Sequence, residues 1–170
     1  MQRMPINKYL ILSIAAILLT RKAMAATKED KLKILLPKLE GFTQKPFWDF
    51  KQWTWGYGTK VPGSSNNKNI TPSGTITKLA AMEAALKHIQ SDFVYLSSLI
   101  NITLTPSQWA ALLSLSYNVG KYNADNLVQN INADNKEALE VQWKKYIYAG
   151  GQVSKGLKAR RAKEWDLWSS

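Results

Sequence analysis

The sequence predicts an α+β fold in which a small β-hairpin lobe and a larger helical lobe are joined by one long helix, with a cleft between the lobes. Three observations lead to this expectation. Residues 47–57 are rich in aromatic residues and contain glycine, which is typical of a short hairpin. Residues 77–99 carry apolar side chains three and four positions apart, which predicts a long helix. Several further helical patterns follow residue 105.

An amphipathic helix is expected to precede the hairpin. Its apolar stripe, at i, i+3, i+4 and i+7, is Leu32, Leu35, Leu36 and Leu39. Glu40 follows this stripe directly, and Gly41 is suited to end the helix. Pro37 is expected either to kink the helix just before Glu40 or to end it and begin another turn. A dehydrated carboxyl group at the negative pole of a helix favours its protonated form, which a general acid needs.

The hairpin is expected to carry Asp49 and Thr54 back over the end of this helix. Glu40 would then lie in an apolar setting and Asp49 in a polar one, which is how a glycosidase divides acid and base work between two carboxyl groups. Taken alone, the same residues are better explained as a solvated helix end and a turn.

Residues 40–59 also carry a longer motif: Glu-Gly-aromatic, then Asp, then Thr shortly before Gly-Tyr-Gly-Thr. This pattern resembles the phage-type lysozymes, the endolysins of glycoside hydrolase family 24. The resemblance places the catalytic constellation of that family on Glu40, Asp49 and Thr54. Two departures are visible. The Asp-to-Thr spacing is one residue shorter, without the usual Gly, and Thr59 stands where the family often has His.

The resemblance extends over roughly residues 32–168 and includes the runs 108–120 and 156–168. In the family an Arg near the Gly-Leu-x-x-Arg-Arg pattern pairs with the catalytic Glu. The match falls on Arg160 or Arg161, and Arg161 is the preferred candidate. Such a pair would orient the Glu40 carboxylate but oppose its protonation. The net change in the pKa of Glu40 therefore stays open at this point.

The function that the resemblance implies is a muramidase that hydrolyses the β-1,4 bond between N-acetylmuramic acid and N-acetylglucosamine in peptidoglycan. Glu40 would protonate the leaving oxygen, while Asp49 and Thr54 would hold and activate water or stabilise positive charge. No cofactor is expected. A carboxyl separation of about 6.5–9.5 Å would favour inversion and about 5–5.5 Å retention; we expect the wider one. The alternatives are a lytic transglycosylase and a non-catalytic peptidoglycan-binding protein.

Residues 1–25 are expected to be a separate segment, and residues 26–170 the catalytic domain. Two basic residues precede an apolar run over residues 9–19, and a small-x-small site follows at residues 23–25, which together indicate a signal peptide. Two basic residues between the run and that site are unusual, so a retained, releasable membrane anchor is the alternative. Both the signal peptide and the anchor predict an exported protein of the periplasm or cell wall. The anchor also predicts transient contact with the membrane.

The composition argues against several other classes of protein. The chain has no Cys and one His, which excludes a thiol nucleophile and disfavours a metal site or a Ser-His triad. His88 lies off the apolar stripe of its helix and is expected to be exposed.

The net charge of +11 falls to +7 without residues 1–25, which hold four basic and no acidic residues. No nucleic-acid motif accompanies this charge. An anionic bacterial wall is the simpler partner, and a monomer is expected.

The remaining elements are predicted from caps and apolar periodicity. Residues 61–75 should form an exposed loop. The inward stripe of the long helix is expected to be Leu79, Met82, Leu86, Ile89, Phe93 and Leu96. Thr105 should open a helix with a capping box, and Gly120 should close it. A short helix is expected at 126–131. Another should start at Asp134, turn Leu139, Trp143, Tyr146 and Ile147 inward, and break at Gly150-Gly151. A basic helix should span 156–168, with its tryptophans buried rather than in contact with lipid.

Overall fold

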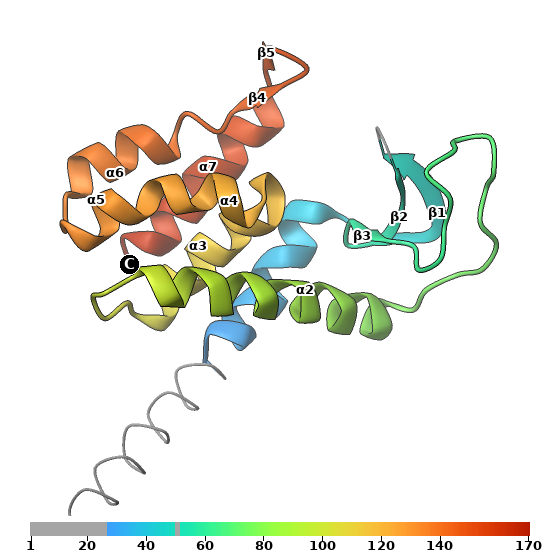
Figure 1. Cartoon of the computed structure of the whole chain (residues 1–170), viewed down its shortest axis with the longest axis horizontal. Helices are drawn as coiled ribbons and strands as arrows, with labels where there is room; N and C mark the ends of the chain where they lie inside the picture. Colours follow the sequence, from blue (N-terminus) through green and yellow to red (C-terminus); the bar gives the residue numbers. More distant parts are fainter. Residues whose placement is uncertain (1–26, 50–51) are drawn as a thin grey trace, which may run out of the picture.

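The computed structural model describes residues 27–49 and 52–170 and has a small sheet at one end of a helical body (Figure 1). The predictions for residues 1–25 therefore lie outside the described residues. Within the described part, no helix combines the length and apolar character needed to cross a membrane. After a helix over residues 27–40 come β1 (Thr43–Asp49), β2 (Gln52–Gly56), β3 (Thr59–Lys60), α2 (Lys78–Leu99), α3 (Pro106–Val119), α4 (Lys121–Ala124), η1 (Asp125–Leu127), α5 (Val128–Asn132), α6 (Lys136–Trp143), β4 (Tyr148–Ala149), β5 (Gln152–Val153) and α7 (Lys155–Trp168).

The first described helix is continuous through Pro37 and ends at Glu40. Leu32 and Leu36 are fully buried, which confirms the predicted apolar stripe. Gly41 then takes a φ of +67°, a conformation that glycine adopts without strain, and the chain turns away into β1. Of the two outcomes expected at Pro37, an early end of the helix is therefore wrong. Glu40 is held at the last position of a helix that is anchored in the core.

The predicted hairpin is confirmed as an antiparallel sheet in the order β1-β2-β3. Trp48 pairs with Trp53 and Asp49 with Gln52, and the register shifts between Thr43 and Phe47. The residues at the tip of the hairpin, 50–51, are not among those described. The loop from Val61 to Thr75 is free of helix and strand, as expected.

The long helix α2 joins the sheet to the helical body (Figure 1). Its start is confirmed, since the Thr77 side chain accepts a hydrogen bond from the Ala80 amide. Most of the predicted inward stripe is confirmed: Ile89 and Leu96 are buried, and Met82, Leu86 and Phe93 are half-buried against the core. Leu79 is the exception, since it is 71% exposed. The buried positions are Ala81, Ala85, Ile89, Asp92 and Leu96. Small alanines face the sheet because the backbone of the sheet lies close to α2 there. A prediction from helical periodicity, by contrast, favours large apolar side chains at the inward positions.

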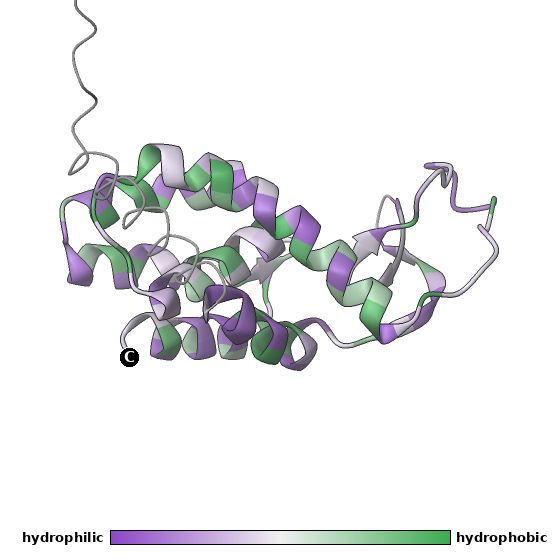
Figure 2. Ribbon diagram, turned by 90° about the horizontal axis from the view of Figure 1, so that it is seen from below, coloured by the Kyte–Doolittle hydropathy of each residue, from purple (hydrophilic) through white to green (hydrophobic). Residues whose placement is uncertain are grey.

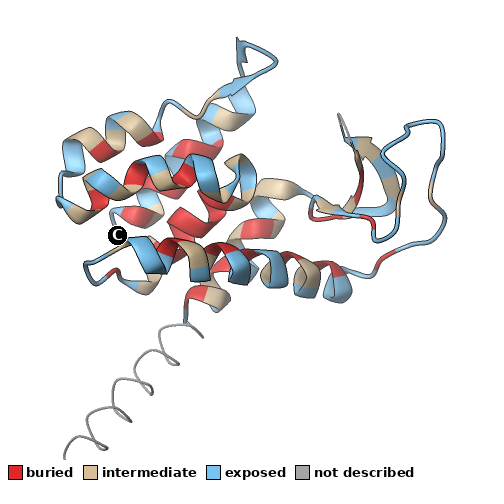
Figure 3. Cartoon of the chain, in the orientation of Figure 1, coloured by how far each residue is buried: buried red, intermediate tan, exposed pale blue. Residues whose placement is uncertain are grey.

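The core is centred on α3, in which every residue from Trp109 to Ser116 is buried. Apolar and polar residues alternate along the helices (Figure 2), and the buried ones gather where α3 meets its neighbours (Figure 3). The predicted capping box is confirmed: Thr105 and Gln108 exchange side-chain to backbone hydrogen bonds, and Gly120 closes the helix.

The C-terminal third differs from the prediction in two places. The cap of α6 is Asn135 rather than Asp134, which instead has a φ of +49°. This helix also ends at Trp143, well before Gly150-Gly151, and a two-stranded hairpin, β4–β5, turns at those glycines. The basic helix is confirmed as α7. Trp165 and Trp168 are buried against Trp143, as expected, and do not face solvent.

The contact between the sheet and α2 yields a first prediction. A Cβ at Gly56 would lie 2.7 Å from the Ala81 Cβ, and the φ of Gly56 is +63°. We expect Gly56→Ala to lower the free energy of unfolding by about 2–5 kcal/mol, the sum of backbone strain and overpacking. Gly63→Ala is the matched control, since Gly63 has a φ of +67° with nothing near its Cβ position; it should cost only about 1–2 kcal/mol. Equal losses in urea unfolding would contradict the close contact.

A second prediction concerns Lys28, which is 2% exposed and whose Nζ lies 2.8 Å from the centre of the Phe93 ring. Burial lowers the pKa of Lys28 from 10.5 to about 8, against a smaller opposing effect of Glu29. Between these two values the unfolded chain binds more protons than the folded one, so stability should rise with pH there.

We therefore expect Lys28→Met to stabilise the protein by about 1–3 kcal/mol at pH 7, with the gain disappearing towards pH 10.5. The measurement is the melting temperature of variant and wild type from pH 6 to pH 10.5. Lys38→Met, at an exposed position of the same helix, is the control and should change little at any pH. A constant difference across this range would contradict the lowered pKa.

Candidate active site

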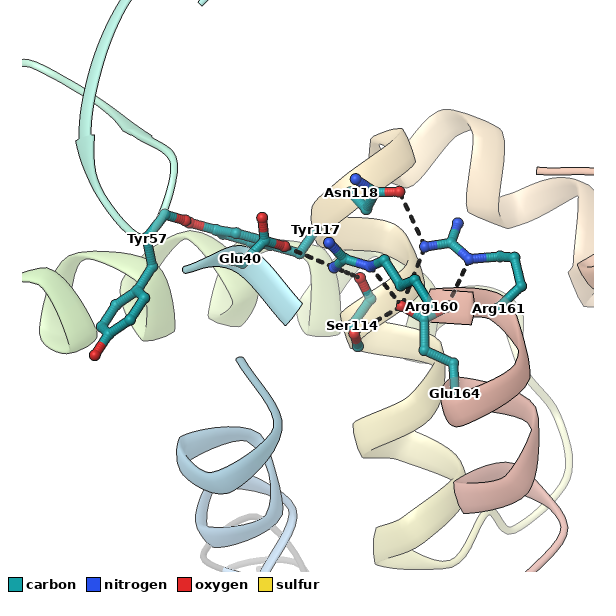
Figure 4. A network of polar contacts seen from close by, with 8 residues as sticks. All are labelled: Glu40, Tyr57, Ser114, Tyr117, Asn118, Arg160, Arg161 and Glu164. Atoms are coloured by element: carbon teal, nitrogen blue, oxygen red, sulfur yellow. Dashed lines mark hydrogen bonds and ion pairs between the residues drawn. The ribbon is translucent and has the colours of Figure 1, made fainter. Parts of the chain in front are cut away.

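Glu40 is joined to the far end of the chain by an ion pair with Arg160 of α7 (Figure 4). Its Oε1 lies 2.6 Å from the Arg160 Nη2, and the Glu40 side chain is only 15% exposed. A partly dehydrated carboxylate at this distance from a guanidinium is held in a defined orientation. The end of the first helix and the middle of α7 thus meet at one charged contact.

Arg160 is itself fixed on three sides. Its Nε donates to the Glu164 Oε1 at 2.9 Å, and its Nη2 donates to the Ser114 carbonyl of α3 at 3.0 Å as well as facing Glu40. Burial lowers the pKa of Arg160, but the charges and hydrogen bonds of Glu40 and Glu164 raise this pKa by more. The net effect is therefore a raised pKa. The guanidinium is a buried, permanently charged link between two carboxylates.

The preference for Arg161 as the partner of Glu40 is wrong. Arg161 points instead towards Glu164 and Asn118, donating through Nη2 to the Asn118 Oδ1 at 2.9 Å and pairing through Nε with the Glu164 Oε2 at 2.9 Å. Burial outweighs the effect of Glu164 and lowers the pKa of Arg161. Neighbouring residues on a helix point about 100° apart, so only one of two adjacent arginines can face Glu40.

Tyr117 ties α3 to the sheet beside Glu40. Its hydroxyl donates to the Tyr57 carbonyl at 2.8 Å, while the Tyr57 ring points away from the cluster (Figure 4). Burial raises the pKa of Tyr117, and the charge of Glu40 raises it further, so the phenol stays protonated and can donate. Gly58 follows in the same turn, and a Cβ there would lie 3.8 Å from the Glu40 Oε2. The turn between β2 and β3 is therefore held next to the carboxylate.

Asp49 and Thr54 lie on one face of the hairpin. Asp49 pairs with Gln52 and Phe47 with Thr54, and directly opposed residues of a sheet point to the same side. The Trp48–Trp53 pair occupies the other face. Asp49 is exposed, whereas Thr54 is fully buried and its Oγ1 has no hydrogen-bond partner among the described residues. The Thr54 hydroxyl therefore lies on the face of the hairpin that carries Asp49.

Sequence reasoning missed four members of this site: Ser114, Tyr117, Asn118 and Glu164. Glu164 had a detectable signal, since it stands three and four positions after the two arginines on a predicted helix, where side chains meet. The other three carry no such signal, because their contacts come from segments that are distant in the sequence. Among the described residues no group of three or more metal-ligating side chains comes together. Two hollows, of about 180 and 740 Å³, lie in the helical lobe and include none of the predicted site residues.

Comparison with known proteins gives a consistent result. The family model for phage lysozyme matches residues 37–164. An endolysin of Bacillus phage PZA is 26% identical over 122 residues, which are 71% of this chain and 45% of the relative. The chain thus spans about half the length of this relative. A SAR-endolysin of Bacteriophage PS119 is 30% identical over 134 residues, covering 76% of this chain and 77% of the relative.

A solved structure of a P22 lysozyme mutant has the same fold. It superimposes with a TM-score of 0.68 at 28% sequence identity and covers 82% of this chain and 96% of that one. The small sheet and larger helical part described above are therefore arranged as in a lysozyme, which confirms the predicted fold class.

The bond between the lobes yields a third prediction. Tyr117→Phe would leave the Tyr57 carbonyl without its donor, and we expect it to cost about 1–3 kcal/mol of the free energy of unfolding. Tyr122→Phe makes the same chemical change at an exposed tyrosine and should stay within about 0.5 kcal/mol of wild type. Chemical denaturation followed by tryptophan fluorescence gives both values. A Tyr117→Phe protein as stable as Tyr122→Phe would show that this bond does not hold the sheet.

Proposed function

Because this chain belongs to the phage lysozyme family, we propose that it is an endolysin-type muramidase, which hydrolyses the β-1,4 bond between N-acetylmuramic acid and N-acetylglucosamine in bacterial peptidoglycan. The observation that carries the proposal is the Glu40 carboxyl group, fixed at a helix end by Arg160 beside the hairpin that bears Asp49 and Thr54. The endolysin of phage PZA and the SAR-endolysin of phage PS119 support the same activity.

Each residue has a role in this proposal. Glu40 gives its proton to the oxygen of the leaving sugar as the bond from that oxygen to the anomeric carbon breaks. Thr54 holds a water molecule through its unpaired Oγ1. The Asp49 carboxylate stabilises the positive charge on the sugar ring and accepts a proton from the water as it adds to the anomeric carbon. The wider carboxyl spacing, and hence inversion, stays our expectation.

We further propose that the protein is exported to the periplasm or cell wall and acts there as a monomer. The SAR-endolysin relatives support export. Residues 1–25 would be a cleaved signal or a retained anchor that touches the membrane transiently. The net charge of +11 favours attraction to an anionic wall, an effect that falls with ionic strength. No cofactor and no nucleic acid has a role in this proposal.

The test is the turnover of purified peptidoglycan by the full chain in mild detergent. We expect Glu40→Gln to lower kcat by about 10²–10⁴-fold, because the amide cannot supply a proton. Glu83→Gln makes the same change at an exposed position of α2 and should retain full activity. Asp49→Asn and Thr54→Val should also lose activity, since a hydrolase needs its water positioned.

The mass of the released fragments separates the alternatives. Reducing muropeptides that depend on Glu40 support the muramidase. Fragments with an anhydro ring, released whether or not Asp49 and Thr54 are intact, would replace it with a lytic transglycosylase. Binding of peptidoglycan without fragments, equally in wild type and Glu40→Gln, would leave a wall-binding protein.

A further inference from the structure

Glu164 is the most deeply buried carboxyl group of the cluster around Glu40, and the proposed chemistry gives it no role. It has no exposed surface. Its Oε1 accepts hydrogen bonds from the Ser114 Oγ at 2.8 Å, the Arg160 Nε at 2.9 Å and the Arg161 Nη2 at 3.2 Å, and its Oε2 lies 2.9 Å from the Arg161 Nε. Burial raises the pKa of Glu164 against the opposing effect of the two arginines.

The two buried arginines require a carboxylate partner, but stability alone does not explain why this cluster is charged rather than apolar. Buried ion pairs lose most of their attraction to the cost of dehydrating both partners, and apolar residues of similar size often serve as well. Glu164 instead occupies the point where it can act on the guanidinium that faces Glu40. It stands four residues after Arg160 on α7, so the two side chains meet on one side of the helix.

The contact with Glu164 also sets the orientation of the Arg160 guanidinium towards Glu40. The group is planar and its donors have fixed directions. Glu164 holds the Nε edge, and this determines where Nη2 points, namely at the Glu40 Oε1 and the Ser114 carbonyl. If the Nε edge were released, Arg160 could rotate and still form an ion pair with Glu40, but in a different geometry.

The charges in the cluster are also balanced. Arg160 and Arg161 face Glu40 and Glu164, and Arg161 pairs with Glu164, so Arg160 remains for Glu40. Among the described residues, the neighbours of this cluster on α3, Tyr117, Ser114 and Asn118, are uncharged, and so is the turn at Gly58. The carboxyl group of Asp49 lies on the hairpin and is exposed. His88 lies beyond Tyr117, against its ring. Without the negative charge of Glu164 the cluster would carry one excess positive charge.

We infer that Glu164 is a positioning residue of the reaction: through Arg160 it sets the orientation of Glu40 and, by its charge, keeps Glu40 able to take up a proton. This inference rests on the proposed muramidase function. It predicts two separable effects. Loss of the correct geometry lowers kcat, and loss of the charge favours the ionised form of Glu40, so that the alkaline limb of the activity profile moves to lower pH.

The experiment compares three variants of the full chain. Glu164→Gln removes the charge, and Glu164→Asp keeps the charge but shortens the reach. Asp92→Asn is the control, since Asp92 is likewise buried, accepts a hydrogen bond from Ser116 of α3, and lies outside the cluster. For each we measure kcat on purified peptidoglycan from pH 4 to pH 9, the melting temperature, and the titration of the Glu40 carboxyl carbon by NMR.

We expect Glu164→Gln to lower kcat by about 10–100-fold and to move the alkaline limb and the Glu40 titration to lower pH. Glu164→Asp should lower kcat while leaving both midpoints in place. Asp92→Asn should lower the melting temperature only. A purely structural role for Glu164 would give the Asp92→Asn pattern in both Glu164 variants.

The inference is overturned if folded Glu164→Gln keeps the kcat and the pH profile of wild type. If Glu164→Gln does not fold, Glu164→Asp provides the test, because an unchanged kcat in that variant would also contradict the positioning role. Wild-type protein without turnover would instead refute the proposed muramidase. In that case the NMR titration still decides the positioning role, since an unshifted Glu40 midpoint in Glu164→Gln would reject it.

Discussion

The ion pair between Glu40 and Arg160 is the contact on which the candidate site depends. It joins the end of the first described helix to α7, across 120 residues of sequence, and α7 in turn rests on α3. Because Arg160 is buried and permanently charged, it needs the two carboxylates on either side of it. The same requirement keeps Glu40 in one place, so a condition for stable folding also orients the proposed acid. The charged cluster is thus part of the core and, in the proposed chemistry, also positions the acid.

The hairpin lobe is held against this cluster by two neutral contacts. Gly56 lets the sheet approach Ala81 of α2, and Tyr117 donates a hydrogen bond to the turn after β2. Neither contact belongs to the proposed chemistry, yet together they hold the turn after β2, and with it Gly58, beside Glu40. The candidate site is therefore assembled from one rigid charged part and one small sheet placed by close packing.

Predictions from the sequence held where the deciding residues lie near one another along the chain. The capping box of α3, the cap of α2 and the hairpin are of this kind, because each depends on a few consecutive residues. Errors arose where a distant segment competed. Leu79 fits the apolar period of α2 but is exposed, because the sheet approaches the helix through alanines. Similarly, α6 ends at Trp143, whose side chain packs against Trp165 and Trp168, and the β4–β5 hairpin follows before α7.

By itself the sequence determined the fold class, the position of Glu40 at a helix end, and the placing of Asp49 and Thr54 on a hairpin. These follow from helical and strand periods and from local turn chemistry, and a family motif supports them. Only the tertiary structure decided that Arg160 rather than Arg161 meets Glu40, that Glu164 joins both arginines, and that Tyr117 reaches the Tyr57 carbonyl. The reason is the rotation of α7 and α3 about their axes, which core packing sets and no local pattern encodes.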